Sequence, residues 1–197
     1  MEHYFSRKPK AKHRLGRIGC TLRGKKFNFL TDSGVFSKDR IDFGSRFLLE
    51  VVEVLKSDEI LDLGCGYGVL GIALADSCKR VLMIDVNERA CILAEINVRE
   101  NGVMNAEVRL GSLEVVFEKF DCILTNPPIK AGKKKIFELI EKSRKYLKKD
   151  GRFYLVARTK LGAKSLAKHM LKTFGNVETV AKKGGYRVFK SCYSQRF

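Results

Sequence analysis

The chain reads Asp62-Leu63-Gly64-Cys65-Gly66-Tyr67-Gly68-Val69-Leu70-Gly71 at the end of an apolar run that begins at residue 59. The run predicts a buried strand over residues 59–63, and the apolar residues after the glycines predict a short helix over residues 69–77. Glycines permit the tight turn between the two and let a ligand approach the backbone closely. In a doubly wound sheet such a turn lies beyond the carboxyl ends of the strands, where nucleotide-like cofactors bind.

Strands and helices alternate on either side of this turn. Strands are predicted over residues 59–63, 80–85, 106–110, 120–125, 152–157, 176–181 and 186–193. Helices are predicted over residues 43–55, 69–77, 88–101, 136–149 and 161–174, with Asp42 and Asn87 as N-caps of two of them. The alternation implies an α/β fold. It is a doubly wound, mostly parallel seven-stranded sheet with helices on both faces and an antiparallel C-terminal hairpin strand.

The N-terminal region differs from the rest. Residues 1–17 are polar and basic, and the runs at residues 20–23 and 26–30 flank Gly24-Lys25 and predict a small β-hairpin. The 197 residues contain no internal repeat, low-complexity tract or second apolar core. We therefore expect a basic arm and hairpin extension over residues 1–30 and a single domain over residues 31–197.

The net charge of +17 is unevenly distributed. Residues 1–26 carry +8 and residues 130–172 carry +12, whereas residues 27–129, which include the glycine turn, carry −7. A basic field of this kind favours a polyanionic partner, and nucleic acid, most plausibly RNA, is the natural one. The alternative is a solvated lysine-rich surface, which thermostable proteins also have.

Composition argues against several classes of protein. No apolar stretch approaches the roughly 20 residues that cross a bilayer, so no membrane partner is expected. The first residues lack the apolar segment of a secretory signal. The six cysteines are scattered without a CxxC pair, as expected of reduced core residues and not of a disulfide framework or metal site. We therefore expect a cytoplasmic protein without a metal.

A second motif, Asn126-Pro127-Pro128-Ile129, follows the strand predicted over residues 120–125. Proline has no N–H to donate and its φ is fixed, so the two prolines end the strand abruptly. The resulting corner presents an amide side chain and backbone carbonyls above the edge of the sheet. These acceptors suit a planar amino group, because they can hold both of its hydrogens while its nitrogen faces an electrophile. Taken alone, the corner is equally compatible with an ordinary strand-ending turn.

Two cofactors compete for the glycine turn. Gly66, Gly68 and Gly71 match the G-x-G-x-x-G dinucleotide fingerprint, and Asp85 lies nineteen residues beyond Gly66, near the position of the ribose-binding acid. Asp62, however, places a carboxylate where it opposes the charge of a pyrophosphate. The same carboxylate suits the sulfonium and α-ammonium groups of S-adenosylmethionine. Asp85 serves the ribose hydroxyls with either cofactor.

The glycine turn, the acid that ends the next strand and the N-P-P corner together resemble a Rossmann-like class I S-adenosylmethionine-dependent methyltransferase. The finer resemblance is to the methyltransferase small domain group that is similar to the bacterial 16S rRNA guanine-N2 methyltransferase C family. Residues 34–45 resemble the G-V-F-S…D-x-G-[ST] segment of that group. Residues 126–133 resemble its N-P-P-I-[RK]-A-G-K variant, which is seen in compact single-domain members. The resemblance runs from about residue 4 to the C-terminus.

The resemblance implies a role for each matching residue. The residues implied for S-adenosylmethionine are Asp62, Gly64, Cys65, Gly66, Asp85, Val86, Ser112 and Phe36. The implied catalytic residues are Asn126, Pro127 and Pro128, and the implied substrate-binding residues are Ile129, Lys130 and Lys133. Asp85 would hold the ribose and Val86 would pack near the adenine, while Asn126 and Pro127 would hold the amino group that receives the methyl.

Two departures from the group's pattern matter. Many members have Ser-Asp-Leu where this chain has Gly111-Ser112-Leu113, so weaker charge assistance to the adenine amino group is expected. Nucleobase methyltransferases also often place an aromatic residue after N-P-P, on which a flipped base can stack, and Ile129 has no π-face. A stacking partner would then come from elsewhere, with Phe36 as one candidate.

The expected reaction is methylation of an exocyclic amino group of RNA, with guanine N2 in 16S ribosomal RNA as the acceptor that the resemblance implies. Adenine N6 satisfies the same corner. A glutamine side chain in protein is a further alternative, because its amide is also planar. From another class, an NAD-dependent oxidoreductase is the remaining alternative, and Asp62 argues against it.

Overall fold

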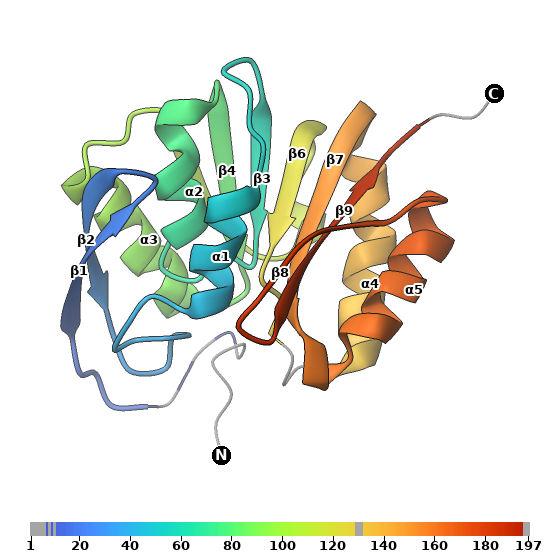
Figure 1. The fold of residues 1–197 in the computed structure, drawn as a ribbon. Coiled ribbons are helices and arrows are strands. Elements are labelled where there is room, and N and C mark those ends of the chain that lie inside the picture. The colour runs from blue at the N-terminus through green and yellow to red at the C-terminus, as the bar shows by residue number, and fades with distance from the viewer. Residues whose placement is uncertain (1–6, 8, 10, 129–131, 195–197) are drawn as a thin grey trace.

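A computed structural model describes residues 7, 9, 11–128 and 132–194. The main sheet has the strand order β5-β4-β3-β6-β7-β9-β8 (Figure 1). Its strands are β3 (Glu59–Leu63), β4 (Arg80–Asp85), β5 (Ala106–Leu110), β6 (Phe120–Thr125), β7 (Leu147–Arg158), β8 (Glu178–Lys183) and β9 (Tyr186–Cys192). The helices are α1 (Phe43–Val51), α2 (Val69–Leu74), α3 (Glu88–Glu100), α4 (Lys133–Ser143) and α5 (Ala163–Phe174).

The first five strands of this order run parallel, and of the C-terminal hairpin only β9 runs against them. β9 pairs with β7 in antiparallel register, with Arg158 opposite Tyr186, and β8 pairs with β9. The strand order reverses between β3 and β6, so the carboxyl ends of β3, β4 and β6 meet around one crevice. The predicted doubly wound, mostly parallel seven-stranded sheet with its antiparallel hairpin is confirmed.

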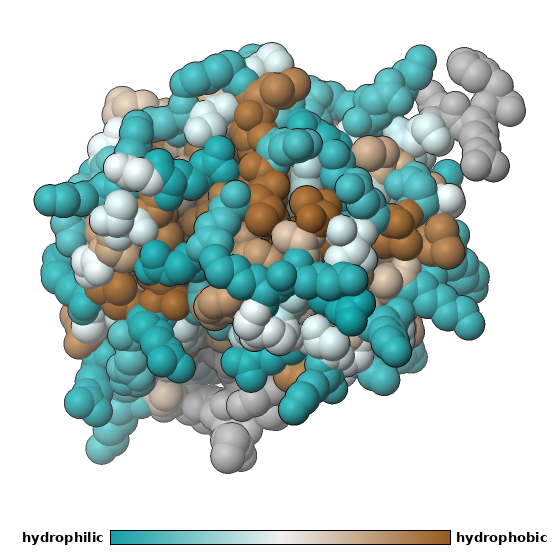
Figure 2. Space-filling model, in the orientation of Figure 1, coloured by the Kyte–Doolittle hydropathy of each residue, from teal (hydrophilic) through white to brown (hydrophobic). Residues whose placement is uncertain are grey.

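Two apolar cores hold the helices against the sheet, with α1, α2 and α3 on one face and α4 and α5 on the other (Figure 1). Alternate residues of each strand enter opposite cores. Ile60 and Met83 face the first core, for example, while Leu61 and Leu82 face the second. Side chains of this kind are worth about 1.5–3 kcal/mol each when fully buried. Outside the cores, hydrophilic side chains cover most of the surface in Figure 2, with apolar residues in separate patches.

The predicted N-terminal hairpin is also confirmed, as β1 (Gly16–Leu22) and β2 (Lys25–Thr31). It packs on α3 through the amide of Asn97, whose Oδ1 accepts from Leu30 N at 2.7 Å and whose Nδ2 donates to Leu30 O at 3.0 Å. The same Nδ2 donates to the carbonyl of Tyr67 in the glycine turn at 2.9 Å. One buried amide therefore joins the extension, α3 and the turn.

One predicted helix boundary is wrong. The helix predicted over residues 136–149 begins at Lys133 and ends at Ser143; a 3₁₀ turn (Arg144–Tyr146) follows, and Leu147 already belongs to β7. Leu147 is fully buried opposite Phe120, and the backbone N–H of Asp150 donates to Tyr193 O at 2.8 Å. Tertiary pairing thus overrides the helix propensity of the lysine-rich segment. Other predicted ends differ by a few residues.

The state of the cysteines and the length of the helices can be read directly from the structure. All six cysteines are free thiols, and four of them are buried. In the part of the chain that the structure describes, no helix has the length and apolar character to cross a bilayer.

Candidate active site

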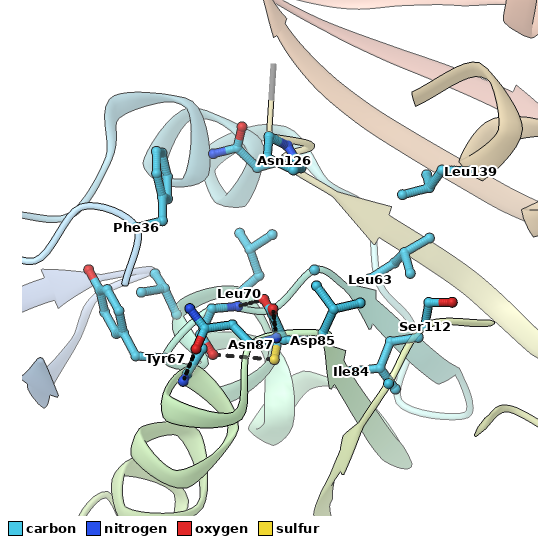
Figure 3. A pocket seen from close by; sticks show the side chains of 18 of the residues that line it. Phe36, Leu63, Tyr67, Leu70, Ile84, Asp85, Asn87, Ser112, Asn126 and Leu139 are labelled. Carbon is cyan, nitrogen blue, oxygen red and sulfur yellow. Dashed lines mark hydrogen bonds between the residues drawn. The ribbon is translucent and has the colours of Figure 1, made fainter. Parts of the chain in front are cut away.

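A cavity of about 490 Å³ opens where the carboxyl ends of β3, β4 and β6 meet (Figure 3). The predicted residues that line it are Phe36, Gly64, Cys65, Gly66, Asp85, Val86, Ser112, Asn126 and Pro128. Asp62, Pro127 and Lys133 do not line it. Ile129 and Lys130 lie outside the described residues. The structure therefore brings the glycine turn, Asp85 and the N-P-P corner to one crevice.

The Asp85 carboxylate holds the glycine turn in place. Its Oδ2 accepts from Gly66 N at 2.8 Å and its Oδ1 accepts from Asn87 N at 2.9 Å. Burial raises the pKa of this carboxyl. Gly64 and Gly66 have φ angles of 78° and 57°, and a Cβ on either would meet no atom within 4 Å. The turn therefore leaves open space against its backbone, in which the chain of a cofactor fits.

Asp62 lies beneath the turn and not on the cavity wall. Its side chain is fully buried, and its Oδ2 accepts from Gly71 N at 2.9 Å, which fixes the start of α2. Its Oδ1 is buried and has no hydrogen-bond partner among the described residues. Burial raises the pKa of this carboxyl to about 7, and the neighbouring charge of Asp85 adds to the rise. An unpaired buried carboxylate oxygen fits a cofactor that carries positive charge.

The amide of Asn126 is oriented by two groups from the start of α1. Its Nδ2 donates to Asp42 Oδ2 and to Ser45 Oγ, both at 2.9 Å. A carboxylate has only acceptors, so the NH₂ side must face Asp42. Both amide hydrogens are then used, and within the described part of the chain Oδ1 accepts no hydrogen bond. The only group that the side chain offers to a ligand is an acceptor.

Asp42 also caps α1, because its Oδ2 accepts from Ser45 N at 3.2 Å. The cap was predicted, but its contact with residue 126 was not. The sequence signal that existed was the resemblance of residues 34–45 to a family segment. A cap residue carries no local sign that it meets a side chain 84 positions away.

Phe36 and Asn126 lie on one side of the cavity, and Asp85 and Ser112 lie on the other (Figure 3). The segment that carries Phe36 is held from below. Tyr67 Oη donates to Ser37 O at 3.1 Å, and Asn87 Nδ2 donates to Gly34 O at 2.9 Å. Sequence reasoning did not single out Tyr67, because a tyrosine inside a glycine turn has no distinctive pattern.

The other end of the cavity is an apolar slot with one polar pair beside it. Val86 and Leu113 line the slot, and the hydroxyl of Ser112 bonds to the carboxylate of Glu114. That bond lowers the pKa of Glu114. With its hydrogen given to Glu114, the Ser112 hydroxyl turns its lone pairs to other donors. A carboxylate is absent at residue 112 itself, but the Glu114 carboxylate is hydrogen-bonded to the Ser112 hydroxyl.

The N-terminal arm contributes a further wall. Arg7 lines the cavity, and its carbonyl accepts from Glu88 N at 3.0 Å. Arg89 fastens the arm by donating to the carbonyls of Pro9 at 3.2 Å and Ala11 at 3.0 Å. Asp32 accepts from Arg14 N at 2.6 Å. Composition alone left the order of this arm open.

Comparisons with known proteins identify the family. The family model described as "Methyltransferase small domain" matches residues 26–190. YbxB of Bacillus subtilis, an uncharacterised protein, is 42% identical over 196 residues, which cover 96% of this chain and 98% of that protein. Ribosomal RNA small subunit methyltransferase C of Actinobacillus succinogenes is 30% identical, over 96% of this chain and 59% of that protein.

A solved structure has the same fold. It is the T. thermophilus 16S rRNA N2 G1207 methyltransferase in complex with AdoMet and guanosine, with a TM-score of 0.83 and 24% identity. The match covers 91% of this chain and 50% of that one, so the chain spans about half of that protein. The chain belongs to the methyltransferase small domain family of class I S-adenosylmethionine-dependent methyltransferases.

Proposed function

We propose that this methyltransferase modifies an exocyclic amino group of RNA, with guanine N2 in 16S ribosomal RNA as its acceptor. The observation that carries the proposal is the Asn126 amide, whose hydrogens are committed to Asp42 and Ser45. It leaves an acceptor, Oδ1, at the cavity that would hold the cofactor. An amino group has two hydrogens and can give one to that acceptor, whereas a carbonyl oxygen or an unprotonated ring nitrogen of a base has none to give.

Different residues around the cavity would bind different parts of the cofactor. Asp85 would accept from the ribose hydroxyls, and the apolar slot of Val86 and Leu113 would take the adenine, with the Ser112 hydroxyl accepting from its amino group. Gly64 and Gly66 would lie against the methionine chain. Asp62 would act from beneath the turn by stabilising positive charge through its unpaired oxygen.

Catalysis would then consist of positioning and electrostatics. Bound S-adenosylmethionine supplies a methyl group that is activated by its sulfonium. Asn126 Oδ1 would accept one amine hydrogen, and a backbone carbonyl of the Pro127-Pro128 corner would accept the other. The nitrogen lone pair is thereby turned toward the cavity. Water takes the proton that the methylated nitrogen loses.

Charge supports RNA as the source of the amine. Residues 130–172 carry +12 and begin immediately after the corner. Lys135 and Lys142 of α4 line the cavity mouth, and Lys133 is exposed at the first residue of that helix. Ribosomal RNA methyltransferase C proteins are among the curated relatives. Cations at the rim would hold phosphates while the corner selects the amine.

The test is methyl transfer to 16S ribosomal RNA isolated from a strain that lacks this protein, followed by nucleoside mass spectrometry. N2-methylguanosine is the expected product. N6-methyladenosine would move the acceptor to adenine. Methyl transfer to proteins of the same strain, with none to its RNA, would refute RNA as substrate. Titration with S-adenosylhomocysteine and with NAD should show binding of the first only.

Asn126→Ala should abolish transfer and leave S-adenosylhomocysteine affinity unchanged. Asn28→Ala, in the exposed β2 strand, serves as the matched control and should be fully active. Near-full activity of Asn126→Ala would contradict the role of the amide.

A further inference from the structure

An aromatic and guanidinium cluster lies close to the N-P-P corner and is not used by the proposed reaction. The ring centroids of Phe43 and Tyr186 are 5.2 Å apart and tilted by 41°. The guanidinium of Arg158 lies 5.1 Å from the centroid of the Tyr186 ring, and its Nε donates to Tyr186 Oη at 2.6 Å. Three planar groups from α1, β7 and β9 therefore form one continuous surface, which we call the stacking platform.

The stacking platform adjoins the groups that orient Asn126. A Cβ on Gly44 would come within 2.8 Å of Asp42 Oδ2 and 3.0 Å of Tyr186 Cε1, so the carboxylate and the ring flank the same glycine. Arg158 and Tyr186 are register partners at the carboxyl end of β7, next to β6. The platform thus lies next to Asp42, the carboxylate that accepts from the NH₂ group of Asn126.

Exposure and charge make this surface available to a polyanion. Phe43 is 40% exposed although it begins a helix that packs on the core, and Arg158 is exposed. Tyr186 is buried and fixes the other two in place. Phe43 rests on the hairpin turn between β8 and β9, where a Cβ on Gly184 would come within 2.8 Å of its ring. An exposed ring beside a guanidinium plane is the combination that stacks unpaired bases.

We propose that Phe43 and Arg158, held in place by Tyr186, stack an unpaired nucleobase of the substrate RNA, the one adjacent to the nucleotide that receives the methyl group. The proposal rests on the proposed function for the identity of the polymer. The acceptor base would occupy the Oδ1 side of Asn126, and its neighbour in the RNA would lie on the platform. Phosphate contacts alone would give affinity without placing the acceptor, whereas a stacked neighbour fixes its register.

The experiment uses a single-stranded oligouridine with one guanosine and a 2-aminopurine on its 5′ or 3′ side, bound to the full chain with S-adenosylhomocysteine. Stacking on the platform should quench the 2-aminopurine fluorescence in one of the two oligomers. Phe43→Leu keeps the apolar volume but removes the π-face, and Arg158→Lys keeps the charge but removes the plane. Each should weaken RNA affinity by about tenfold and abolish the quenching.

Two matched substitutions control for exposure and charge. Phe117→Leu changes a ring that is 87% exposed just before β6, and Arg99→Lys changes an exposed arginine of α3. Both should leave affinity and quenching unchanged. S-adenosylhomocysteine affinity and thermal melting should be the same for all four variants, which separates stacking from a folding defect.

The outcomes separate the two proposals. Wild-type affinity and quenching in Phe43→Leu and Arg158→Lys, or no binding of either oligomer by the wild type, would overturn the platform. Platform-dependent binding without methyl transfer to any RNA would overturn the proposed function and leave the platform standing.

Discussion

The Nδ2 atom of Asn126 lies 2.9 Å from Oδ2 of Asp42, a residue 84 positions earlier in the chain. The same carboxylate caps α1. One side chain therefore has two roles: it caps a helix, and it engages the NH₂ group of an amide so that only the amide oxygen remains for a ligand. Its removal should affect stability and chemistry separately.

Asp42→Ala should lower the free energy of unfolding by about 1 kcal/mol through loss of the cap. It should also lower the methyl-transfer rate at least about tenfold, because the amide is then free to turn its NH₂ side toward the amine. Asp42→Ser restores a capping oxygen, but its shorter side chain does not reach the amide. Chemical denaturation should show recovered stability in the serine variant, and rate measurements should show no recovery. If Asp42→Ser recovered both the stability and the methyl-transfer rate, the role of Asp42 would be limited to capping α1.

Gly44→Ala tests the same arrangement sterically. Alanine normally stabilises a helix relative to glycine by about 1 kcal/mol. Here the new Cβ would press on Asp42 Oδ2 and on Tyr186. We expect no gain in melting temperature and a loss of methyl-transfer activity, measured on the same sample. A more stable and fully active variant would show that the carboxylate has room to move.

The Asp62 carboxyl should make stability depend on pH. Its pKa is raised to about 7 in the folded protein from an ordinary value of 3.8, so between these values the native state binds more protons than the unfolded state. The free energy of unfolding of the cofactor-free protein should therefore fall by about 2–4 kcal/mol as pH rises from 4 to 7. Urea titrations across this range should show the decline, and Asp62→Asn should flatten it. An unchanged pH profile in that variant would contradict the assignment.

The same carboxyl should link cofactor affinity to pH. Positive charge on the ligand favours the ionised form, so S-adenosylhomocysteine, with its α-ammonium group, should bind more tightly at pH 8 than at pH 6. Calorimetry should also detect release of a proton on binding near pH 6. Asp62→Asn should bind equally at both pH values and release none.

Glu114→Ala tests the polar pair beside the apolar slot. Without the carboxylate, the hydrogen of the Ser112 hydroxyl has no fixed direction. The hydroxyl oxygen is then no longer oriented to accept a hydrogen bond from the adenine amino group. S-adenosylhomocysteine affinity should fall by about three- to tenfold. Glu178→Ala, on the exposed β8 strand, is the matched control. Equal affinity in both variants would exclude Glu114 from adenine binding.

Local patterns predicted much of this molecule. Strands such as residues 80–85 are apolar runs bounded by polar residues. Asn87 predicts the start of α3, because asparagine is a favoured N-cap residue and stands directly before the helical pattern. The end of α4 was missed because lysines favour a helix, and only pairing with Phe120 makes Leu147 a strand residue. The glycine turn and Asp85 are likewise local signals. The contacts of Asp42 with Asn126, of Tyr67 with Ser37 and of Arg89 with the arm join distant segments, and no single stretch encodes them.

The tie between Asp42 and Asn126 also has a consequence for the order in which the protein assembles. The amide acquires its direction only after α1 has docked beside β6, which requires closing a long loop of chain. The pairing of β3 with β4, which carry the glycine turn and Asp85, joins segments that are closer in the chain. A chain that stops before residue 126 would contain the glycine turn and Asp85, but it would lack the amide that is proposed to bind the acceptor amine.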